Sequence, residues 1–105
     1  MPSKKEEIVL IAKSLLKQQI GIVEASRILI RLRYEAQLED EENLNIFRAI
    51  DSETDHLPIG LLRENYSSTK LVEVDEEIKK CDEFYEKLVE NACKNLIAKY
   101  DKYYL

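Results

Sequence analysis

The sequence is poor in the residues that break helices and in those that build metal and redox sites. Its 105 residues include two glycines, two prolines, two cysteines, one histidine and no tryptophan. Such a low glycine and proline content argues against a disordered or loop-rich chain. Hydrophobic residues make up 45% of the chain and charged residues 35%, a balance typical of a folded soluble protein. We therefore predict a single domain over residues 1–105.

Long apolar runs are also missing. No stretch approaches the roughly 20 apolar residues of a membrane span. The apolar run near the N-terminus is too short, and too closely flanked by charges, for a signal peptide. Cys81 and Cys93 lie on one predicted helix, about 18 Å apart along its axis, which is too far for a disulfide between them. We expect two free thiols and a cytoplasmic protein.

The familiar catalytic and metal-binding motifs are missing too. The sequence has no glycine-rich phosphate loop, no HExxH, no CxxC and no GxSxG. Asp51, Glu53 and Asp55 alternate as in a calcium loop, but His56 and Leu62 stand where that loop needs glycine and glutamate. His56 beside a carboxylate leaves a general base open as an alternative, without an evident nucleophile or oxyanion donor. We predict a protein that is not an enzyme, with no catalytic residue, cofactor or metal.

A basic cluster large enough for nucleic acid is not present. The net charge is −5, whereas nucleic-acid-binding domains usually carry a basic stripe for phosphate contacts. Between Glu35 and Asp55 eight acidic residues stand against one basic residue, Arg48. This acidic stretch is either a solvated face or a surface that steers a basic partner into contact. Upstream of it, Arg27, Arg31 and Arg33 are spaced to pair with neighbouring acids, with an anion site as the alternative.

What the chain does have is helical periodicity, which predicts an all-α fold: a compact bundle of about four to six helices with a long C-terminal helix. Ser3 and Glu6 form a capping box at the start of the first helix. Gly21 is expected to end that helix in the left-handed conformation. The broad apolar stripe of residues 22–37 predicts a second, central helix.

Asp40 is the expected N-cap of a third, short helix that ends near Asp51. Ser68 is the expected N-cap of the last helix, whose roughly thirty residues would span about 45 Å. Its apolar stripe comprises Leu71, Val74, Ile78, Cys81, Tyr85, Leu88, Ala92, Leu96 and Tyr100.

Between these two helices the run DSETDHLPIG (51–60) predicts a tightly specified connector. Ser52 and Asp55 form a cap-like pair for one helical turn. Pro58 disfavours helix at Leu57, and Gly60 can take a positive φ. Leu57, Ile59, Leu61 and Leu62 are expected to anchor the connector to the core, and its acids to accept hydrogen bonds from exposed amides or to pair with Arg63. The residues expected to specify the connector are Ser52, Leu57, Pro58, Gly60 and Arg63.

The same region resembles a group of small bacterial proteins that share an IDSETDxLPxGxxRxxW centre followed by a long helix with a DxE start. Tyr66 stands where the pattern usually has tryptophan, and Asp75 and Glu77 match the DxE. Residues 20–29 are also similar to the second-helix region of that group. The matching central positions are Ile50, Asp51, Ser52, Glu53, Thr54, Asp55, Leu57, Pro58, Gly60 and Arg63.

The resemblance implies an immunity protein of a bacterial toxin system, including contact-dependent growth inhibition. Its partner would be a cognate toxin domain, and we favour a basic nuclease, an RNase over a DNase, whose cationic cleft an acidic surface can cover. Residues shared across such a group would hold the common fold, so residues 40–45 weigh more in recognition than residues 51–55. The predicted partner-binding residues are Glu39, Asp40, Glu41, Glu42, Asn45, Asp51, Glu53 and Asp55.

A second interpretation is a non-catalytic helical adaptor, or a homodimer that forms through the long C-terminal helix. Tyr100, Tyr103 and Tyr104 would then be exposed at its end as an aromatic binding surface. Alternatively, this tail packs on the first helix.

Overall fold

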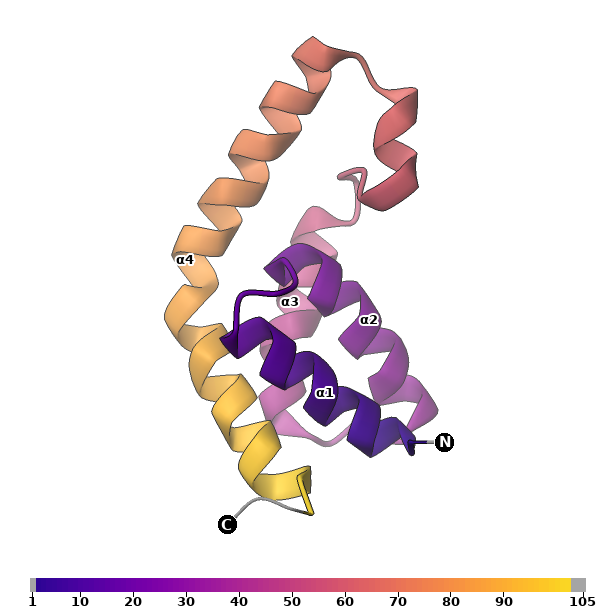
Figure 1. The fold of residues 1–105 in the computed structure, drawn as a ribbon, viewed down its shortest axis with the longest axis vertical. Helices are drawn as coiled ribbons and strands as arrows, with labels where there is room; N and C mark the ends of the chain where they lie inside the picture. The colour runs from indigo at the N-terminus through magenta and orange to yellow at the C-terminus, as the bar shows by residue number, and fades with distance from the viewer. Residues whose placement is uncertain (1, 103–105) are drawn as a thin grey trace.

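The computed structural model describes residues 2–102, and in that range it contains helices and no strand (Figure 1). The predicted all-α fold with a long C-terminal helix is confirmed. In chain order the elements are α1 (Lys4–Leu16), α2 (Ile22–Glu35), the 3-10 helix η1 (Glu42–Leu44), α3 (Asn45–Thr54), the 3-10 helix η2 (Gly60–Asn65) and α4 (Ser68–Tyr100).

The core lies between α1, α2, α3 and the C-terminal half of α4 (Figure 1). Each of these elements contributes at least one fully buried apolar side chain, namely Ile8, Leu29, Phe47 and Leu96. The second helix packs against α1, α3 and α4, which is the central position predicted for it.

Residues 60–80, which comprise η2 and the first part of α4, extend away from this body and are called the arm below (Figure 1). Val74 is the one arm residue that is buried. Leu61 is 82% exposed and Leu62 59%, so the prediction that both anchor the connector to the core is wrong. They lie on η2, which has no second layer of helices over it.

The ends of α1 agree with the sequence at the first residue and differ at the last. The Ser3 hydroxyl accepts a hydrogen bond from the Glu6 amide at 3.2 Å, as the capping box predicts. The helix ends at Leu16, and Gln18 rather than Gly21 takes the left-handed conformation, with φ of 56°. Gly21 instead precedes α2 as its N-cap, with φ of −74°. The chain therefore reverses three residues earlier than expected.

The ends of α3 also differ from expectation. Glu41, not Asp40, accepts a hydrogen bond from the Asn43 amide (3.1 Å) and starts η1, which continues into α3. The helix extends to Thr54 instead of ending near Asp51. Ser52 therefore lies within the helix, and the predicted cap-like pair with Asp55 does not form.

In α4 the N-cap is Ser67, whose hydroxyl accepts from the Lys70 amide at 3.1 Å, one residue before the predicted cap. Val74, Tyr85 and Ala92 are buried as the stripe predicts. Leu88, however, is 52% exposed, and Val89 takes its place in the core.

Cys81 and Cys93 are both free thiols, as expected. Burial raises the pKa of Cys93 to about 12, which keeps this thiol protonated and unreactive at neutral pH.

The two glycines provide a matched test of backbone conformation. Gly60 has φ of +64° and Gly21 does not, while open space surrounds the Cβ position of both. Gly60→Ala is expected to lower the free energy of unfolding by about 1 kcal/mol, because an alanine is strained at positive φ. Gly21→Ala is expected to lower it by less, because alanine is a poorer N-cap than glycine but also restricts the unfolded chain, and the two effects oppose each other. Urea unfolding of both variants measures the difference, and equal effects would contradict the left-handed assignment.

Candidate functional site

The acidic segment between α2 and α3 is held in place by Arg33, from the last turn of α2. This side chain is 8% exposed. Its Nε donates to the Leu38 carbonyl at 3.0 Å, and its Nη2 lies within hydrogen-bonding distance of the Glu39 carbonyl (2.6 Å) and the Glu41 carbonyl (3.2 Å). Nη2 also donates to the Asn45 side-chain oxygen at 2.8 Å. One guanidinium thus fixes the path of residues 38–45.

Glu41 points into the molecule from this segment. It is 5% exposed, and its carboxylate accepts hydrogen bonds from Lys99 (2.7 Å), from the Tyr100 hydroxyl and from the Asn43 amide and side chain. Burial alone would raise the pKa of Glu41, but the hydrogen bonds from Lys99, Tyr100 and Asn43 outweigh it and lower the pKa to about 2. The Glu41 carboxylate therefore joins the segment to the end of α4, and a partner could reach it only by displacing these groups.

Its neighbours point outward. Glu39, Asp40 and Glu42 are exposed, and within residues 2–102 their carboxylates make no hydrogen bond or ion pair. We call these three residues the acidic turn. Because Arg33 binds the carbonyls of residues 39 and 41, the backbone that carries these side chains has a fixed path, and their carboxylates remain available to a partner.

The remaining predicted contact acids lie on or just after α3. Asp51 and Glu53 interact with other helices, whereas Asp55 is exposed and, among the described residues, has only the adjacent His56 nearby, at 3.9 Å. Asp51 lies 3.9 Å from Nε of Arg27, and Glu53 accepts a hydrogen bond from the Tyr85 hydroxyl at 2.7 Å. The hydrogen bond to Glu53 is the main cause that raises the pKa of Tyr85 to about 12. The structure therefore separates the predicted set into inward or paired acids and the unpaired acidic turn.

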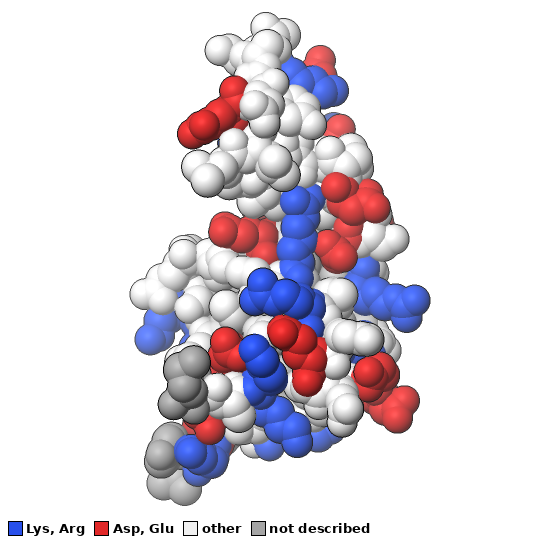
Figure 2. All heavy atoms as spheres, turned by 90° about the vertical axis from the view of Figure 1, so that its right-hand side faces the viewer, with Lys and Arg blue, Asp and Glu red and all other residues white. Residues whose placement is uncertain are grey.

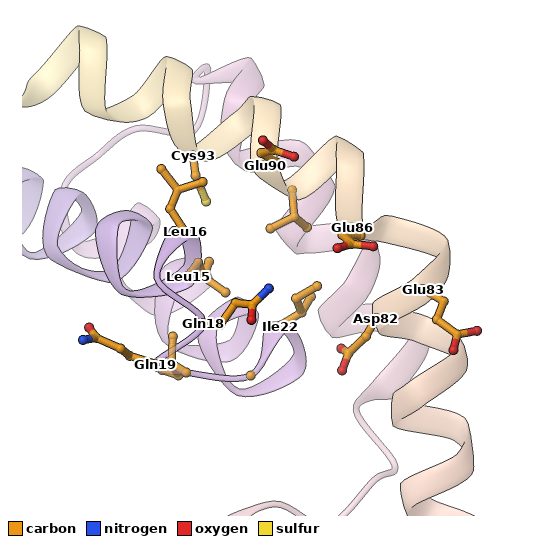
Figure 3. A pocket seen from close by; sticks show the side chains of 13 residues that line it. Leu15, Leu16, Gln18, Gln19, Ile22, Asp82, Glu83, Glu86, Glu90 and Cys93 are labelled. Atoms are coloured by element: carbon orange, nitrogen blue, oxygen red, sulfur yellow. The ribbon is translucent and has the colours of Figure 1, made fainter.

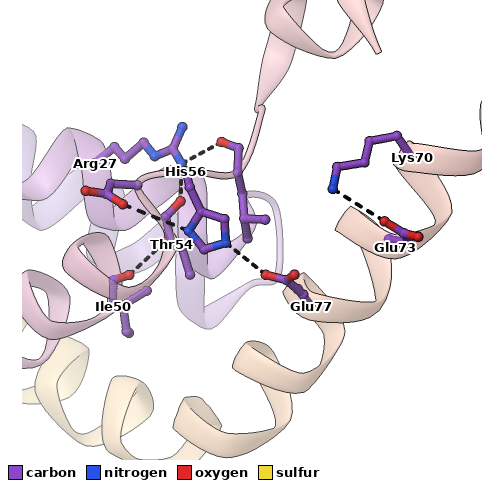
Figure 4. Close-up of polar contacts among 9 residues, drawn as sticks. Arg27, Ile50, Thr54, His56, Lys70, Glu73 and Glu77 are labelled. Carbon is purple, nitrogen blue, oxygen red and sulfur yellow. Dashed lines mark hydrogen bonds and ion pairs between the residues drawn. The ribbon is translucent and has the colours of Figure 1, made fainter. Parts of the chain in front are cut away.

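The connector is organised by Arg27 as the acidic turn is by Arg33 (Figure 4). Nη2 of Arg27 lies 2.5 Å from the Thr54 carbonyl and 2.8 Å from the Leu57 carbonyl. Leu57, which was expected to anchor the connector, is buried, and so is Pro58. Gly60 has the positive φ expected of it.

Arg63 does not pair with the connector acids as expected. Its Nη2 lies 2.9 Å from Asp75 on α4, so the ion pair closes the arm on itself. The expectation fails because α3 carries Asp51 and Glu53 away from the arm.

His56 lies at the surface, where Nε2 is 3.1 Å from the Glu77 carboxylate and Nδ1 is 3.9 Å from Asp55 (Figure 4). This exposed contact links the connector to α4. In the described part of the chain, His56 and its neighbours included, no group of three or more His, Cys, Asp or Glu side chains is arranged to hold a metal ion.

Sequence reasoning missed a cleft of about 620 Å³ between the α1–α2 loop and α4 (Figure 3). Acidic side chains of α4 line one wall, and apolar and glutamine side chains of residues 15–22 line the other. The spacing of Asp82, Glu86 and Glu90, four residues apart on one helix face, was the available signal.

Viewed from the side of α2 and the arm, the body shows basic and acidic side chains interspersed, and the visible face of the arm is mostly uncharged with a few acidic and basic groups at its edges (Figure 2). Among the helices of residues 2–102, none is both long and apolar enough to cross a membrane.

Glu41 and Glu42 offer a matched pair for testing the inward carboxylate. Glu41→Gln is expected to lower the free energy of unfolding at pH 7 by about 2 kcal/mol, because it removes a buried charge-assisted network. The pKa of Glu41 is lowered from 4.5 to about 2, so wild-type stability gained from this group is complete above about pH 4.5 and lost as the pH falls toward 2. The difference between wild type and Glu41→Gln should shrink over that interval in urea unfolding. Glu42→Gln should change stability by less than about 0.5 kcal/mol, and two indistinguishable variants would refute the inward role.

Comparison of the chain with known protein families, with curated proteins and with solved structures finds no match.

Proposed function

We propose that this protein is an immunity protein that binds and neutralises a cognate bacterial toxin. The toxin would be a basic nuclease, an RNase rather than a DNase, whose active-site cleft is covered by an acidic surface. The observation that carries the proposal is the acidic turn: Glu39, Asp40 and Glu42 are exposed and unpaired within residues 2–102, on a backbone held by Arg33. The proposed action needs no cofactor, metal or catalytic residue.

Electrostatics explains why such a turn suits a nuclease. An enzyme that cuts nucleic acid needs cationic groups for the phosphates. Carboxylates placed in advance can occupy the same positions with little ordering cost, and they speed association at low salt. The acidic turn supplies this arrangement, whereas Glu41 already has its cation in Lys99.

The difference between acids that hold the fold and acids that remain exposed also supports the proposal. Residues of the IDSETDxLPxG pattern hold the fold: the Thr54 and Leu57 carbonyls bind Arg27, and Glu53 binds Tyr85. The acidic turn lies outside that pattern. A group of inhibitors with a common fold and different toxins would be expected to vary in such a segment.

A second candidate function is self-association, which the exposed apolar side chains Leu61, Leu62 and Val72 of the arm favour. The predicted aromatic binding surface at the end of α4 is not supported at Tyr100. Its hydroxyl binds Glu41, and its ring lies near Lys5 and Lys99. Tyr103 and Tyr104 lie outside the described residues. Sedimentation that shows a monomer at about 100 µM would eliminate this candidate, since interfaces that hold stable dimers persist at that concentration.

The proposed function is tested with the C-terminal domain of the protein whose gene lies immediately upstream, taken as the candidate toxin. Co-expression in bacterial cells should restore growth, and the purified pair should associate more slowly as salt rises. Replacing Glu39, Asp40 and Glu42 by Gln, Asn and Gln should lower the association rate at low salt by about tenfold or more, because the steering charge is lost.

The matched control replaces three exposed, unpaired acids elsewhere, Glu24, Glu64 and Glu76, by glutamine. This variant has the same net charge but should associate at a rate close to that of wild type. If both triple variants slow association equally, net charge and not the acidic turn drives encounter. If the wild-type protein neither binds nor protects, the proposed function is wrong.

A further inference from the structure

The cleft between α4 and the α1–α2 loop is lined by groups of one charge sign only. Of its thirteen lining residues none is Lys, Arg or His, although four are acidic: Asp82, Glu83, Glu86 and Glu90. All four belong to α4. The facing wall, residues 15–22, contributes aliphatic side chains such as Leu15 and Ile22 together with two glutamines.

These acids are poorly compensated within the molecule. Oδ1 of Asp82 is buried and has no hydrogen-bond partner, and it is the one side-chain polar atom of residues 2–102 in that condition. Figure 3 shows the Asp82 carboxylate turned toward the space between α4 and the loop, on the same side as Gln18 and Ile22. Burial, and then the charge of Glu83, raise the pKa of Asp82. A buried carboxylate oxygen without a donor is unfavourable, so a turn of the half-buried Asp82 side chain that brings it to a donor of a ligand in the cleft would be stabilised.

The neighbouring acids extend this field to the mouth of the cleft. Within the described residues, Glu83 and Glu86 have no ion pair, and Glu90 alone has one, with Lys94 at 2.9 Å. An anionic ligand or a nucleic acid would be repelled by this wall. A purely aliphatic ligand would bury the carboxylates without a donor, which is costly.

We propose that this cleft receives a basic segment of the protein partner, with an arginine or lysine head group at Asp82 and Glu86 and its aliphatic stem against Leu15 and Ile22. Long basic side chains combine an apolar stem with a charged head, so they match a cleft with one apolar and one acidic wall. A volume of about 620 Å³ lies within the range of sites that bind compact ligands and has room for more than one side chain. The identity of that partner as a basic toxin rests on the proposed function, but the preference of the cleft for a cationic segment does not.

A defined peptide tests this preference. The probe is a soluble ten-residue peptide with two arginines and two leucines in an alanine–serine background, and the matched peptides carry glutamine or glutamate in place of arginine. In an NMR titration the arginine peptide should shift the amides of residues 15–22 and 82–90. It should bind at least tenfold more tightly than the glutamine peptide, and the glutamate peptide should not bind.

Variants locate the binding. Asp82→Asn with Glu86→Gln should weaken binding of the arginine peptide about tenfold, whereas the control Glu64→Gln with Glu76→Gln, two exposed acids outside the cleft, should leave it unchanged. If the first variant fails to fold, Glu83→Gln with Glu86→Gln replaces it, because both side chains are exposed and unpaired. Three outcomes would overturn the proposal. The arginine and glutamine peptides bind with equal affinity, the arginine peptide does not bind at millimolar concentration, or the chemical shift changes are confined to residues outside 15–22 and 82–90.

The link to the toxin is measured separately. Loss of toxin neutralisation in the Asp82→Asn/Glu86→Gln variant, with peptide binding also lost, would join the cleft to the proposed function. Peptide binding by a wild-type protein that does not neutralise the toxin would uphold the cleft and refute the proposed function. If the Asp82→Asn/Glu86→Gln variant neutralises the toxin fully and its complex with the toxin dissociates at the wild-type rate, the toxin does not occupy the cleft.

Discussion

The guanidinium of Arg33 is the interaction on which the exposed acidic surface depends. A segment that leaves a helix and reverses direction has carbonyl groups without partners, and buried carbonyls need donors. Arg33 supplies donors to Leu38, Glu39 and Glu41 from one planar group. An ammonium group would reproduce only part of this arrangement, because it has no counterpart of Nε, which binds the Leu38 carbonyl while Nη2 meets the other acceptors. Within residues 2–102 no carboxylate pairs with this buried cation, so Glu39, Asp40 and Glu42 stay available for other contacts.

Arg27, which precedes Arg33 on α2, also binds backbone carbonyls of a neighbouring segment. It binds the carbonyls of Thr54, the last residue of α3, and of Leu57 in the connector. A cation at a helix C-terminus also meets the negative end of the helix dipole. Two arginines of one helix therefore fix the two segments that enclose α3. The expectation that these arginines pair with neighbouring acids holds for Arg31 with Glu35 and, more loosely, for Arg27 with Asp51. Arg33 binds backbone carbonyls instead of acids. The spacing of residues in the sequence does not tell which of these two partners an arginine takes.

Helical periodicity predicted the fold class and most of the core, because apolar faces repeat whatever they pack against. It failed where a choice depends on a neighbour in space. Leu88 and Val89 are both apolar, and only the position of α1 relative to α4 decides which is buried. Leu61 and Leu62 read as anchors, yet no layer covers η2. Asp40 and Glu41 are both plausible caps, and the pull of Lys99 and Tyr100 turns Glu41 inward. The four-residue spacing of acids on α4 was visible in the sequence. The position of the α1–α2 loop, which faces these acids and forms the other wall of the cleft, was not.

The two acidic surfaces lie at opposite ends of α2, and this separation constrains any partner that uses both. The cleft includes Gly21 and Ile22 at the start of α2, and the acidic turn follows its last residues. Fourteen helical residues place them about 21 Å apart along the helix axis. An interface of ordinary size, about 800 Å² on each partner, extends over such a distance. A partner engaging both would need basic groups at two points about 20 Å apart, one protruding to enter the cleft and one placed to meet the exposed acidic turn. A uniformly basic surface would satisfy the turn but leave the cleft empty, so the cleft is the feature that can distinguish one basic partner from another.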